Sequence, residues 1–248
     1  MHPIFQLTKG LEIPSFFLVI SIVLSIGLVW LPSRAKIYHL PQKNVLDLSL
    51  ILMLACLLGA RLFHVIYENP EHYLAAPEKV LYLWEGGFVY YGGAFLGVIA
   101  ALGYLRFKRV SSYGTYFDTF SPVLAFMYGA GRIGCFLAGC CYGRSCDAPW
   151  AIAGKHPAQL YATFWELGVM LILLGFERNR LNKSPGGLFV LWIALHSLGR
   201  LLMESFRDDF RGGLIFNMSI STFISWILLI GSTVALSLQF FKNRKSSP

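Results

Sequence analysis

Arginine and histidine side chains within otherwise apolar stretches are the most chemically informative feature of this sequence. His196, Arg200 and Glu204 are spaced by four residues, and Arg207 follows three residues later. On a helix this spacing would place all four side chains on one face. Two arginines outnumber the one acid there, which favours a site for an anionic group. The alternative is an internal ion pair of Arg200 with Glu204 that helps helices to pack.

A second candidate site is the glycine-rich stretch from Gly129 to Gly143, which holds five glycines and Arg132. Glycines at this density let helices approach closely and let the backbone bend. Arginine offers several fixed donors to an oxyanion, so Arg132 beside this backbone suggests a phosphate clamp. The alternative is an arginine at a helix end whose guanidinium extends to the membrane surface.

Two shorter segments could contribute to the same chemistry. In the segment from Trp84 to Gly93, two Gly-Gly pairs bracket an aromatic run. Backbone N–H groups at a helix N-terminus attract anions, although a simple re-entrant turn explains the pattern equally well. The segment His156-Pro-Ala-Gln159-Leu-Tyr161 opens an apolar run, where His156 and Gln159 would cap a helix or orient a substrate.

The cysteines allow several interpretations. Cys56 lies in an apolar run and reads as a small buried residue, whereas the other four cluster together: Cys135, Cys140, Cys141 and Cys146. A disulfide is one option in an oxidising compartment. A catalytic thiol at Cys135, one helical turn from Arg132, is another. Because their spacing fits no standard zinc pattern, we expect no metal.

Three further ionisable residues lie in apolar runs, namely Arg61, Glu166 and Asp118. We interpret Arg61 and Glu166 as members of structural pairs, and Asp118 as structural. An ionisable group at the centre of a membrane helix costs about 2.5–3.5 kcal/mol by insertion measurements.

The composition indicates which elements must position these residues. Of the 248 residues, 56% are hydrophobic and 14% are charged, against about 25% charged in an average soluble domain. Lipid must therefore solvate part of the chain. We expect an all-α, polytopic membrane protein that forms one domain over residues 1–248. Seven apolar runs approach the length of about 20 residues that spans a bilayer: 14–31, 46–66, 88–105, 116–138, 158–176, 186–203 and 218–241.

The charges of the connections predict the orientation. The first, third and fifth connections and the tail hold twelve Lys and Arg residues and one acid, Glu177, whereas the others are mixed or acidic. The positive-inside rule then places the N-terminus outside and the C-terminus in the cytoplasm. The net charge of +8 is divided among short clusters between apolar runs, which argues against nucleic acid as a partner. No cleavable signal peptide is evident.

The motifs together resemble the prolipoprotein diacylglyceryl transferase family over about residues 45–231. The strongest stretch is Gly131-Arg-Ile-Gly-Cys-Phe-Leu-Ala-Gly-Cys-Cys-Tyr-Gly143. It is similar to the family signature G-R-x-G-N-F-x-N-G-E-x-x-G. Supporting matches follow in order along the chain: Gly59-Ala-Arg-Leu, Trp84-Glu-Gly-Gly, Tyr91-Gly-Gly, His156-Pro-Ala-Gln-Leu-Tyr161 and Gly199-Arg-Leu-Leu-Met-Glu-Ser-Phe-Arg207. Met218-Ser-Ile resembles a late family segment more loosely.

The resemblance implies an enzyme of the bacterial inner membrane with its active site toward the periplasm. It would transfer the diacylglyceryl group of phosphatidylglycerol to the lipobox cysteine of preprolipoprotein signal peptides and release glycerol phosphate. Its partners would be membrane lipids and these signal peptides. The resemblance implies neither a cofactor nor a metal. The catalytic residues would be Arg132, Arg200, His196, Tyr91 and Glu204. The substrate-binding residues would be Arg132, Gly92, Gly93, Gly134, Gly143, His156, Gln159, Tyr161 and Arg207.

The chain departs from the family pattern at several positions. The family has His at Tyr91 and Tyr at His196. Either the two residues have exchanged roles, with His196 as the base, or the two substitutions arose independently in a diverged relative. The family's two Asn and one Glu in the signature are Cys135, Ala138 and Cys140, and a further Glu is Ala162. These departures leave three alternatives: a relative with another acceptor, a transporter of an anionic lipid, and a redox protein that uses Cys140, Cys141 and Cys146.

Overall fold

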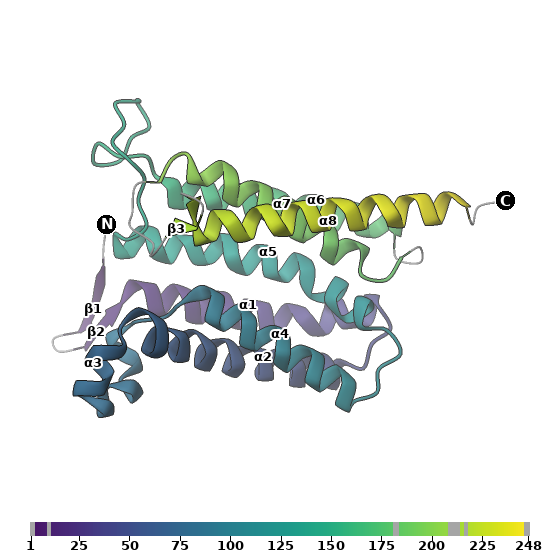
Figure 1. Cartoon of the computed structure of the whole chain (residues 1–248), viewed down its shortest axis with the longest axis horizontal. Coiled ribbons are helices and arrows are strands. Elements are labelled where there is room, and N and C mark those ends of the chain that lie inside the picture. Colours follow the sequence, from purple (N-terminus) through teal and green to yellow (C-terminus); the bar gives the residue numbers. More distant parts are fainter. Residues whose placement is uncertain (1–2, 9–10, 181–183, 208–213, 216–217, 246–248) are drawn as a thin grey trace. The chain divides into compact units, whose positions relative to one another are not determined.

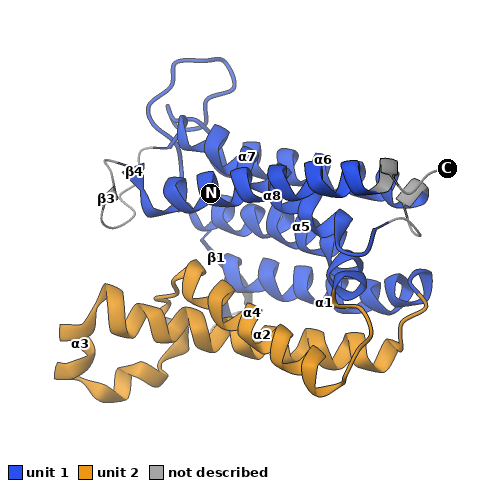
Figure 2. Cartoon of the chain, turned by 45° about the vertical axis from the view of Figure 1, so that its right-hand side comes forward, with its two compact units in different colours: residues 1–38, 114–248 blue, residues 39–113 orange. Residues whose placement is uncertain are grey.

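The computed structural model is mostly helical and divides into two compact units. Unit 1 comprises residues 1–38 and 114–248, and unit 2 comprises residues 39–113 (Figure 2). The expectation of one domain over the whole chain stays a prediction. The structure describes residues 3–8, 11–180, 184–207, 214–215 and 218–245.

Six helices in the described part of the chain are long and apolar enough to cross a bilayer (Figure 1). They are α1 (Ser15–Ile37), α2 (Gln42–Phe63) with its π-helical continuation η1 (His64–Glu68), α5 (Tyr113–Ala138), α6 (Ala158–Arg180), α7 (Gly187–Glu204) and α8 (Ile220–Lys245). Each coincides with a predicted span, which confirms a polytopic helical membrane protein.

The remaining predicted span corresponds to α4 (Tyr90–Phe107), a helix of 18 residues. α4 contains three tyrosines, four glycines and Arg106, and it is not among the six helices counted as long and apolar enough to cross a bilayer. The seven-span count and the orientation of the termini therefore stay predictions.

Two short hairpins depart from the all-α prediction. Strand β1 (Ile4–Thr8) pairs antiparallel with β2 (Leu11–Pro14), and β3 (Leu214–Ile215) pairs antiparallel with β4 (Met218–Ser219). Both hairpins lie immediately before a spanning helix, α1 and α8 respectively. Chain outside a helix must find other partners for its backbone groups, and strand pairing supplies them.

The prediction that the first span ends before Pro32 is wrong, because α1 continues through Pro32 to Ile37. The last turns of α1 are held by Arg34, which is 1% exposed. Its guanidinium donates to the two carboxylate oxygens of Glu177 at 2.5 and 2.6 Å and to the Thr119 carbonyl at 3.2 Å. Arg34 and Glu177 carry opposite charges. Omitting this pair therefore does not change the net positive charge of the connections predicted to be cytoplasmic.

Asp118 is structural, as predicted. Its carboxylate accepts hydrogen bonds from the backbone N–H groups of Gly186 at 2.7 Å and Phe189 at 2.8 Å. These N–H groups belong to the first turn of α7, where no residue of the same helix can accept them. A carboxylate also interacts favourably with the positive end of the helix dipole. Asp118 on α5 thus fixes the start of α7.

Glycines set the contacts among the helices of unit 1 that carry the candidate site. A Cβ atom at Gly129 of α5 would lie 3.0 Å from Cβ of Glu166 on α6, and one at Gly199 of α7 would lie 2.2 Å from Nε1 of Trp165 on α6. Trp165 also donates to the Leu195 carbonyl at 3.0 Å. These close approaches keep α5, α6 and α7 side by side (Figure 1).

Unit 2 is organised around the contact of α2 with α4. A Cβ atom at Gly92 would lie 2.5 Å from the Gly59 carbonyl oxygen, and one at Gly93 would lie 2.7 Å from the Cys56 carbonyl oxygen. Only residues without a side chain allow such an approach of two helix backbones. Because α4 packs closely along α2, a helix that can span the membrane, we expect α4 to cross the membrane as well.

Arg61 organises the connection between these two helices, which contains α3 (Pro70–Ala75), η2 (Pro77–Leu81) and η3 (Leu83–Glu85). The buried guanidinium donates to five backbone carbonyls, those of Lys79, Val80, Tyr82, Gly86 and Gly87. Arg61 therefore has the structural role predicted for it, although its partners are backbone carbonyls.

Candidate active site

The C-terminal end of α5 brings part of the signature into a compact turn. Gly139 adopts a left-handed conformation with φ of 74°. Its N–H donates to the Phe136 carbonyl at 3.2 Å, and the next N–H, of Cys140, donates to the Cys135 carbonyl at 3.1 Å. This bonding pattern is the Schellman motif that ends many helices, and glycine favours it. It folds Cys140 back beside Cys135, and Cys141 follows with φ of 59°.

The three thiol groups form a cluster. The Sγ atoms of Cys135, Cys140 and Cys141 all lie within 4.8 Å of one another, and all five cysteines of the chain are free thiols. Hydrogen bonds from the thiols of Cys135 and Cys140, with the charges of Arg132 and Arg207, hold the pKa of Cys141 below its ordinary value. The expectation of no metal rested on sequence spacing, whereas this geometry could hold a metal ion.

Gly143 is the point at which three distant segments meet. Its N–H donates to the His156 carbonyl at 2.9 Å, and the following N–H, of Arg144, donates to the Phe206 carbonyl at 2.9 Å. Gly143 also forms an antiparallel bridge with Arg207. A Cβ atom here would lie 2.4 Å from the Phe206 carbonyl oxygen and 2.7 Å from Cβ of His156. Glycine is therefore required at this position.

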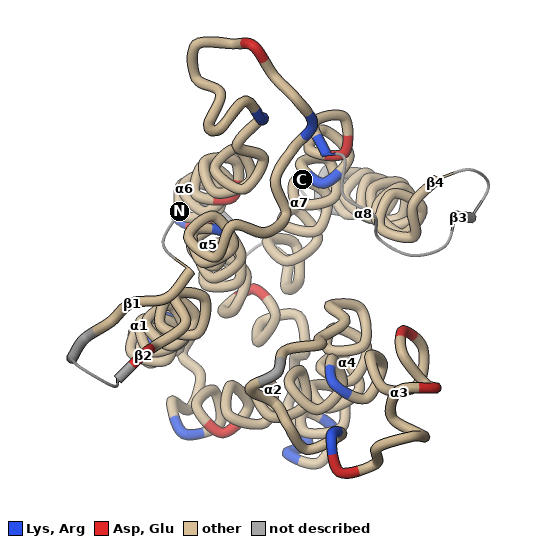
Figure 3. Tube along the Cα trace, turned by 90° about the vertical axis from the view of Figure 1, so that its left-hand side faces the viewer, with Lys and Arg blue, Asp and Glu red and all other residues tan. Residues whose placement is uncertain are grey.

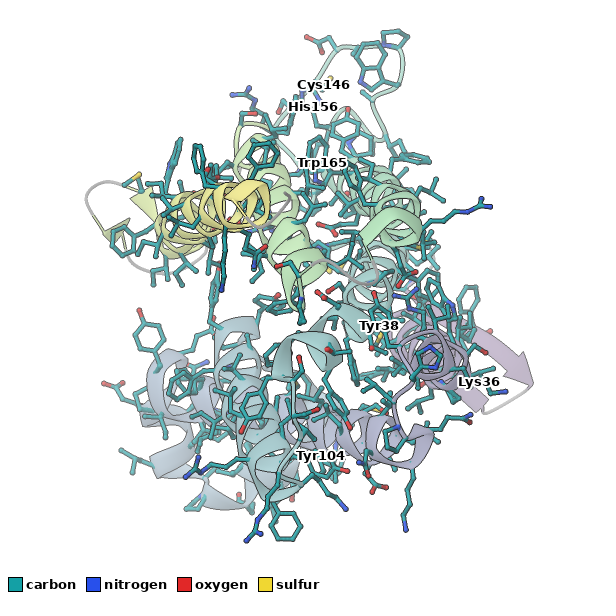
Figure 4. The ribbon with its side chains drawn as sticks, turned by 90° about the vertical axis from the view of Figure 1, so that its right-hand side faces the viewer. Lys36, Tyr38, Tyr104, Cys146, His156 and Trp165 are labelled. Atoms are coloured by element: carbon teal, nitrogen blue, oxygen red, sulfur yellow. The ribbon has the colours of Figure 1, made fainter. Side chains whose placement is uncertain are left out.

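The predicted residue His156 lies at this same end of unit 1, at the base of the 139–157 loop (Figure 4). Gln159 and Tyr161 follow it in the first turn of α6. His156 Nδ1 lies 3.2 Å from the Tyr161 hydroxyl, and both rings pack on Phe206 with centroids 5.2 and 5.4 Å away. Gln159, which is 2% exposed, donates to the Cys140 carbonyl at 2.6 Å.

A cavity of about 190 Å³ opens beside these residues. Its lining combines apolar side chains with His156, Lys155 and Gln159. Lys155 Nζ lies 3.7 Å from the centroid of the Tyr142 ring, which also lines the cavity. Lys, Arg, Asp and Glu residues mark the loop after α5 and the end of α7 in Figure 3, so this end of unit 1 is polar.

A chain of contacts leads from Arg132 into the helices. Arg132 Nη2 donates to the Tyr128 hydroxyl at 2.5 Å, and its guanidinium lies 4.7 Å from the centroid of that ring. The Tyr128 ring meets His196 edge-on with centroids 4.6 Å apart. His196 Nδ1 in turn lies 2.6 Å from a carboxylate oxygen of Glu166. Three helices, α5, α6 and α7, thus contribute to one polar array.

Glu166 is paired, as predicted, and its partner is the candidate site residue His196. Glu166 is 2% exposed, and its other carboxylate oxygen makes no hydrogen bond within the described part of the chain. A carboxylate on one ring nitrogen fixes the tautomer and orientation of a histidine, as in catalytic triads. An ionisable residue within a membrane helix was the available signal, but its partner lies on another helix, 30 positions away.

The predicted polar stripe on α7 is shorter than expected. The helix ends at Glu204, so Arg207 lies beyond it, in the segment that pairs with Gly143, and the placement of all four residues on one helix face is wrong. The Glu204 carboxylate accepts a hydrogen bond from Ser219 Oγ at 2.8 Å. Arg200 makes no ion pair or hydrogen bond to any other residue that the structure describes.

The remaining predicted residues have packing contacts. Gly134 faces α1, where a Cβ atom would lie 3.3 Å from Phe16. Gly92 and Gly93 are buried against α2 in the first turn of α4, next to Tyr91. These three glycines belong to unit 1 (Gly134) and unit 2 (Gly92 and Gly93). Their binding roles, and the role of Tyr91, stay predictions.

Comparison with known proteins decides the family. A family model described as prolipoprotein diacylglyceryl transferase matches residues 3–238. The chain belongs to the prolipoprotein diacylglyceryl transferase family. The resemblance predicted from the signature is therefore confirmed.

Curated relatives of this family match over most of their length. A phosphatidylglycerol–prolipoprotein diacylglyceryl transferase of Geobacter sulfurreducens is 34% identical over 84% of this chain and 82% of its own length. The proteins of the same name from Bordetella avium and Clostridium tetani are 31% and 27% identical, over 87% and 98% of this chain. The chain thus matches whole enzymes of this family.

Proposed function

We propose that this protein transfers the diacylglyceryl group of phosphatidylglycerol to the thiol of a lipobox cysteine in preprolipoprotein signal peptides. The observation that carries the proposal is the convergence of the signature residues at one end of unit 1. Gly143, His156 and Arg207 come from three separate segments and meet near a cavity that His156 lines, and Arg132 lies on α5, the helix that leads to Gly143. The names of the matching relatives support both substrates.

The reaction exchanges one bond for another. The thiol loses a proton, and the thiolate attacks the glyceryl carbon that is bonded to a phosphate oxygen. The carbon–oxygen bond breaks, its electron pair stays with the phosphate, and glycerol phosphate leaves as the thioether forms. Negative charge grows on the departing phosphate, so fixed positive groups accelerate the step. Arg132 and Arg200 supply two guanidinium groups for this purpose.

His196 is the proposed base. The Glu166 carboxylate at 2.6 Å from Nδ1 favours the tautomer in which Nε2 can accept a proton. An ordinary tyrosine side chain keeps its proton at neutral pH, so the residue at position 91 is a poor base. This supports the exchange of roles between Tyr91 and His196.

We also propose an arrangement of the chain in the membrane. The chain crosses the bacterial inner membrane seven times, with α4 as the third span, and its N-terminus lies outside. A helix of 18 residues is about 27 Å long, close to the thickness of about 30 Å of the hydrocarbon core. The 139–157 loop and the end of α7 would then face the periplasm, where preprolipoproteins emerge.

The decisive experiment is incubation of the purified protein with phosphatidylglycerol vesicles and a lipobox peptide, followed by mass spectrometry. We expect a diacylglyceryl adduct on the peptide cysteine. Arg132→Ala should lower the rate by about a hundredfold to a thousandfold. Arg178→Ala, an exposed arginine at the far end of α6, is the matched control and should be unaffected. Absence of adduct from folded wild-type protein would contradict the proposal and favour lipid transport.

The base assignment has its own test in the same assay. His196→Gln should lower the rate by about a hundredfold or more, the usual contribution of a general base. Tyr91→Phe should retain most of the activity if the phenol transfers no proton in the reaction. Full activity of the histidine variant would refute the exchange of roles while leaving the transfer reaction intact.

A further inference from the structure

The three thiols at the end of α5 form the strongest cluster of metal-ligating side chains in the described part of the chain. Their sulfur atoms lie within 4.8 Å of one another. In a tetrahedral zinc site with Zn–S bonds of about 2.3 Å, sulfur atoms are about 3.8 Å apart. Small side-chain rotations would therefore close the cluster around one ion.

The surroundings of the cluster favour a soft, doubly charged ion. Thiolate ligands without carboxylates select zinc and similar soft metals over magnesium or calcium. Arg132 lies one helical turn before Cys135, and Arg207 pairs with Gly143, two residues after Cys141, so two positive charges are available against the excess negative charge of three thiolates around a divalent ion. The backbone that carries the thiols is fixed by the Schellman turn and by Gln159, which holds the Cys140 carbonyl.

The cluster supplies three ligands, and within the described residues no further His, Cys, Asp or Glu joins it. Structural zinc sites are closed by four protein ligands, whereas catalytic sites keep one position open. Cys140 is exposed, so a fourth ligand could approach from outside the protein. The cluster would thus leave one coordination position of the metal open, as catalytic zinc sites do.

We propose that Cys135, Cys140 and Cys141 bind a zinc ion whose open position takes the thiol of the acceptor peptide. This inference rests on the transferase function proposed above and adds to it the means by which the acceptor is activated. Cys135 and Cys140 replace an Asn and a Glu of the family signature, so the chain lacks those polar groups where it has gained soft ligands.

Zinc accounts for the chemistry that the thiol requires. A thiol bound to zinc is deprotonated outright, since the cation stabilises the thiolate. The proton passes to the base, for which His196 is proposed, and the zinc-bound thiolate attacks the glyceryl carbon. The carbon–oxygen bond breaks and glycerol phosphate leaves beside Arg132. The thioether is a weaker ligand than a thiolate, so the product dissociates; no atom changes its oxidation state.

The test compares zinc binding by the full-length protein with that of two variants. Purified protein is loaded with Zn²⁺, desalted and analysed by elemental mass spectrometry, with circular dichroism as the check on folding. We expect about one zinc per chain for a single site, at least a tenfold weaker affinity for Cys140→Ser, and wild-type binding for Cys146→Ser. Cys146 lies outside the cluster, and its Sγ accepts a hydrogen bond from the Ala148 N–H.

The acceptor position is tested with Co²⁺ in place of zinc. The absorption of cobalt bound to thiolates should change when a lipobox peptide is added, and should not change with the peptide in which serine replaces cysteine. An unchanged spectrum with the cysteine peptide would refute the acceptor role. Failure to bind zinc, binding by Cys140→Ser equal to wild type, or a disulfide within the cluster would refute the site.

The two proposals can fail separately. Adduct formation by protein shown to be free of metal would leave the transferase function standing and overturn the zinc inference. Zinc binding with a peptide-dependent cobalt spectrum, but without any adduct, would support the site and overturn the transfer reaction.

Discussion

At the scale of single residues, the pairing of Glu166 with His196 joins a buried carboxylate to the residue proposed as the base. The buried carboxylate holds Nδ1 of the histidine at 2.6 Å, and its second oxygen has no hydrogen-bond partner within the described residues. A carboxylate held against one ring nitrogen fixes the orientation and the tautomer of a histidine, as in catalytic triads. We therefore expect Glu166 to act as a positioning residue for His196.

Glu166→Gln tests this role. Glutamine preserves the size of the side chain but removes the negative charge that stabilises the imidazolium, so the rate of adduct formation should fall at least about tenfold. The double variant with His196→Gln should be no slower than His196→Gln alone, because residues that act as a unit are not additive. Independent, multiplying effects of the two changes would contradict the assignment.

Tyr38 predicts a specific pH dependence of stability. Burial and a hydrogen bond to Glu177 raise the pKa of Tyr38 well above its ordinary value of 10.0. Below that ordinary value the tyrosine is neutral in the folded and unfolded states, and stability is unaffected. Above it the unfolded chain ionises first, so stability falls as pH rises from about 10. Tyr38→Phe should flatten this fall in thermal melts recorded between pH 8 and 11, and an identical slope would refute the prediction.

The sequence predicts single residues unevenly, for physical reasons. Arg132 and Arg200 could be chosen as candidate site residues because a charge in an apolar helix is costly in any membrane fold; their roles stay predictions. The partner of Glu166 could not be identified, because His196 lies on a different helix and only packing sets the distance. Arg207 was placed on the wrong face because the helix ends at Glu204, and nothing in the apolar pattern marks that end.

At the scale of elements, glycine contacts decide how closely α6 and α7 approach. A Cβ atom at Gly199 would lie 2.2 Å from Nε1 of Trp165, whose indole donates to the Leu195 carbonyl. Overpacking of this kind typically costs about 1–3 kcal/mol. It would also shift α7, which carries His196 and Arg200.

Gly199→Ala should therefore lower both the melting temperature in detergent and the transfer rate. Gly175→Ala on α6 is the matched control, because nothing lies within 4 Å of its Cβ position. Alanine is about 1 kcal/mol better than glycine within a helix, so the control should be neutral or stabilising. Equal melting temperatures for the two variants would show that the contact does not limit the approach of these helices.

Elements were the part of the fold most accessible from the sequence. Long apolar runs predicted the positions of all the helices that could span a membrane, because lipid requires them to be helical. The end of α1 was wrong, since Arg34 and Glu177 extend the helix past Pro32. The clustering of four cysteines was predicted, but a geometry of three that could hold a metal ion was not, because the turn at Gly139 and Cys141 brings together residues whose spacing matches no standard metal motif.

At the scale of the whole molecule, the crossing of α4 decides the topology. If α4 spans, the chain crosses seven times and its ends lie on opposite sides; if it does not, six crossings place both ends on the same side. The charges of the connections favour the first arrangement, because the segment after α4 holds Arg106, Lys108 and Arg109 and would be cytoplasmic.

Protease accessibility of an N-terminal and a C-terminal tag on the full-length protein shows directly whether the number of crossings is odd or even. In spheroplasts, an N-terminal epitope should be digested, whereas a C-terminal epitope should be protected until the membrane is permeabilised. Replacing all three basic residues after α4 with glutamine should weaken this asymmetry, since those charges hold the segment in the cytoplasm. Equal accessibility of both tags in the wild-type protein would exclude seven spans. It would also move either the 139–157 loop or the N-terminus to the side opposite the one proposed, because crossings along one chain must alternate.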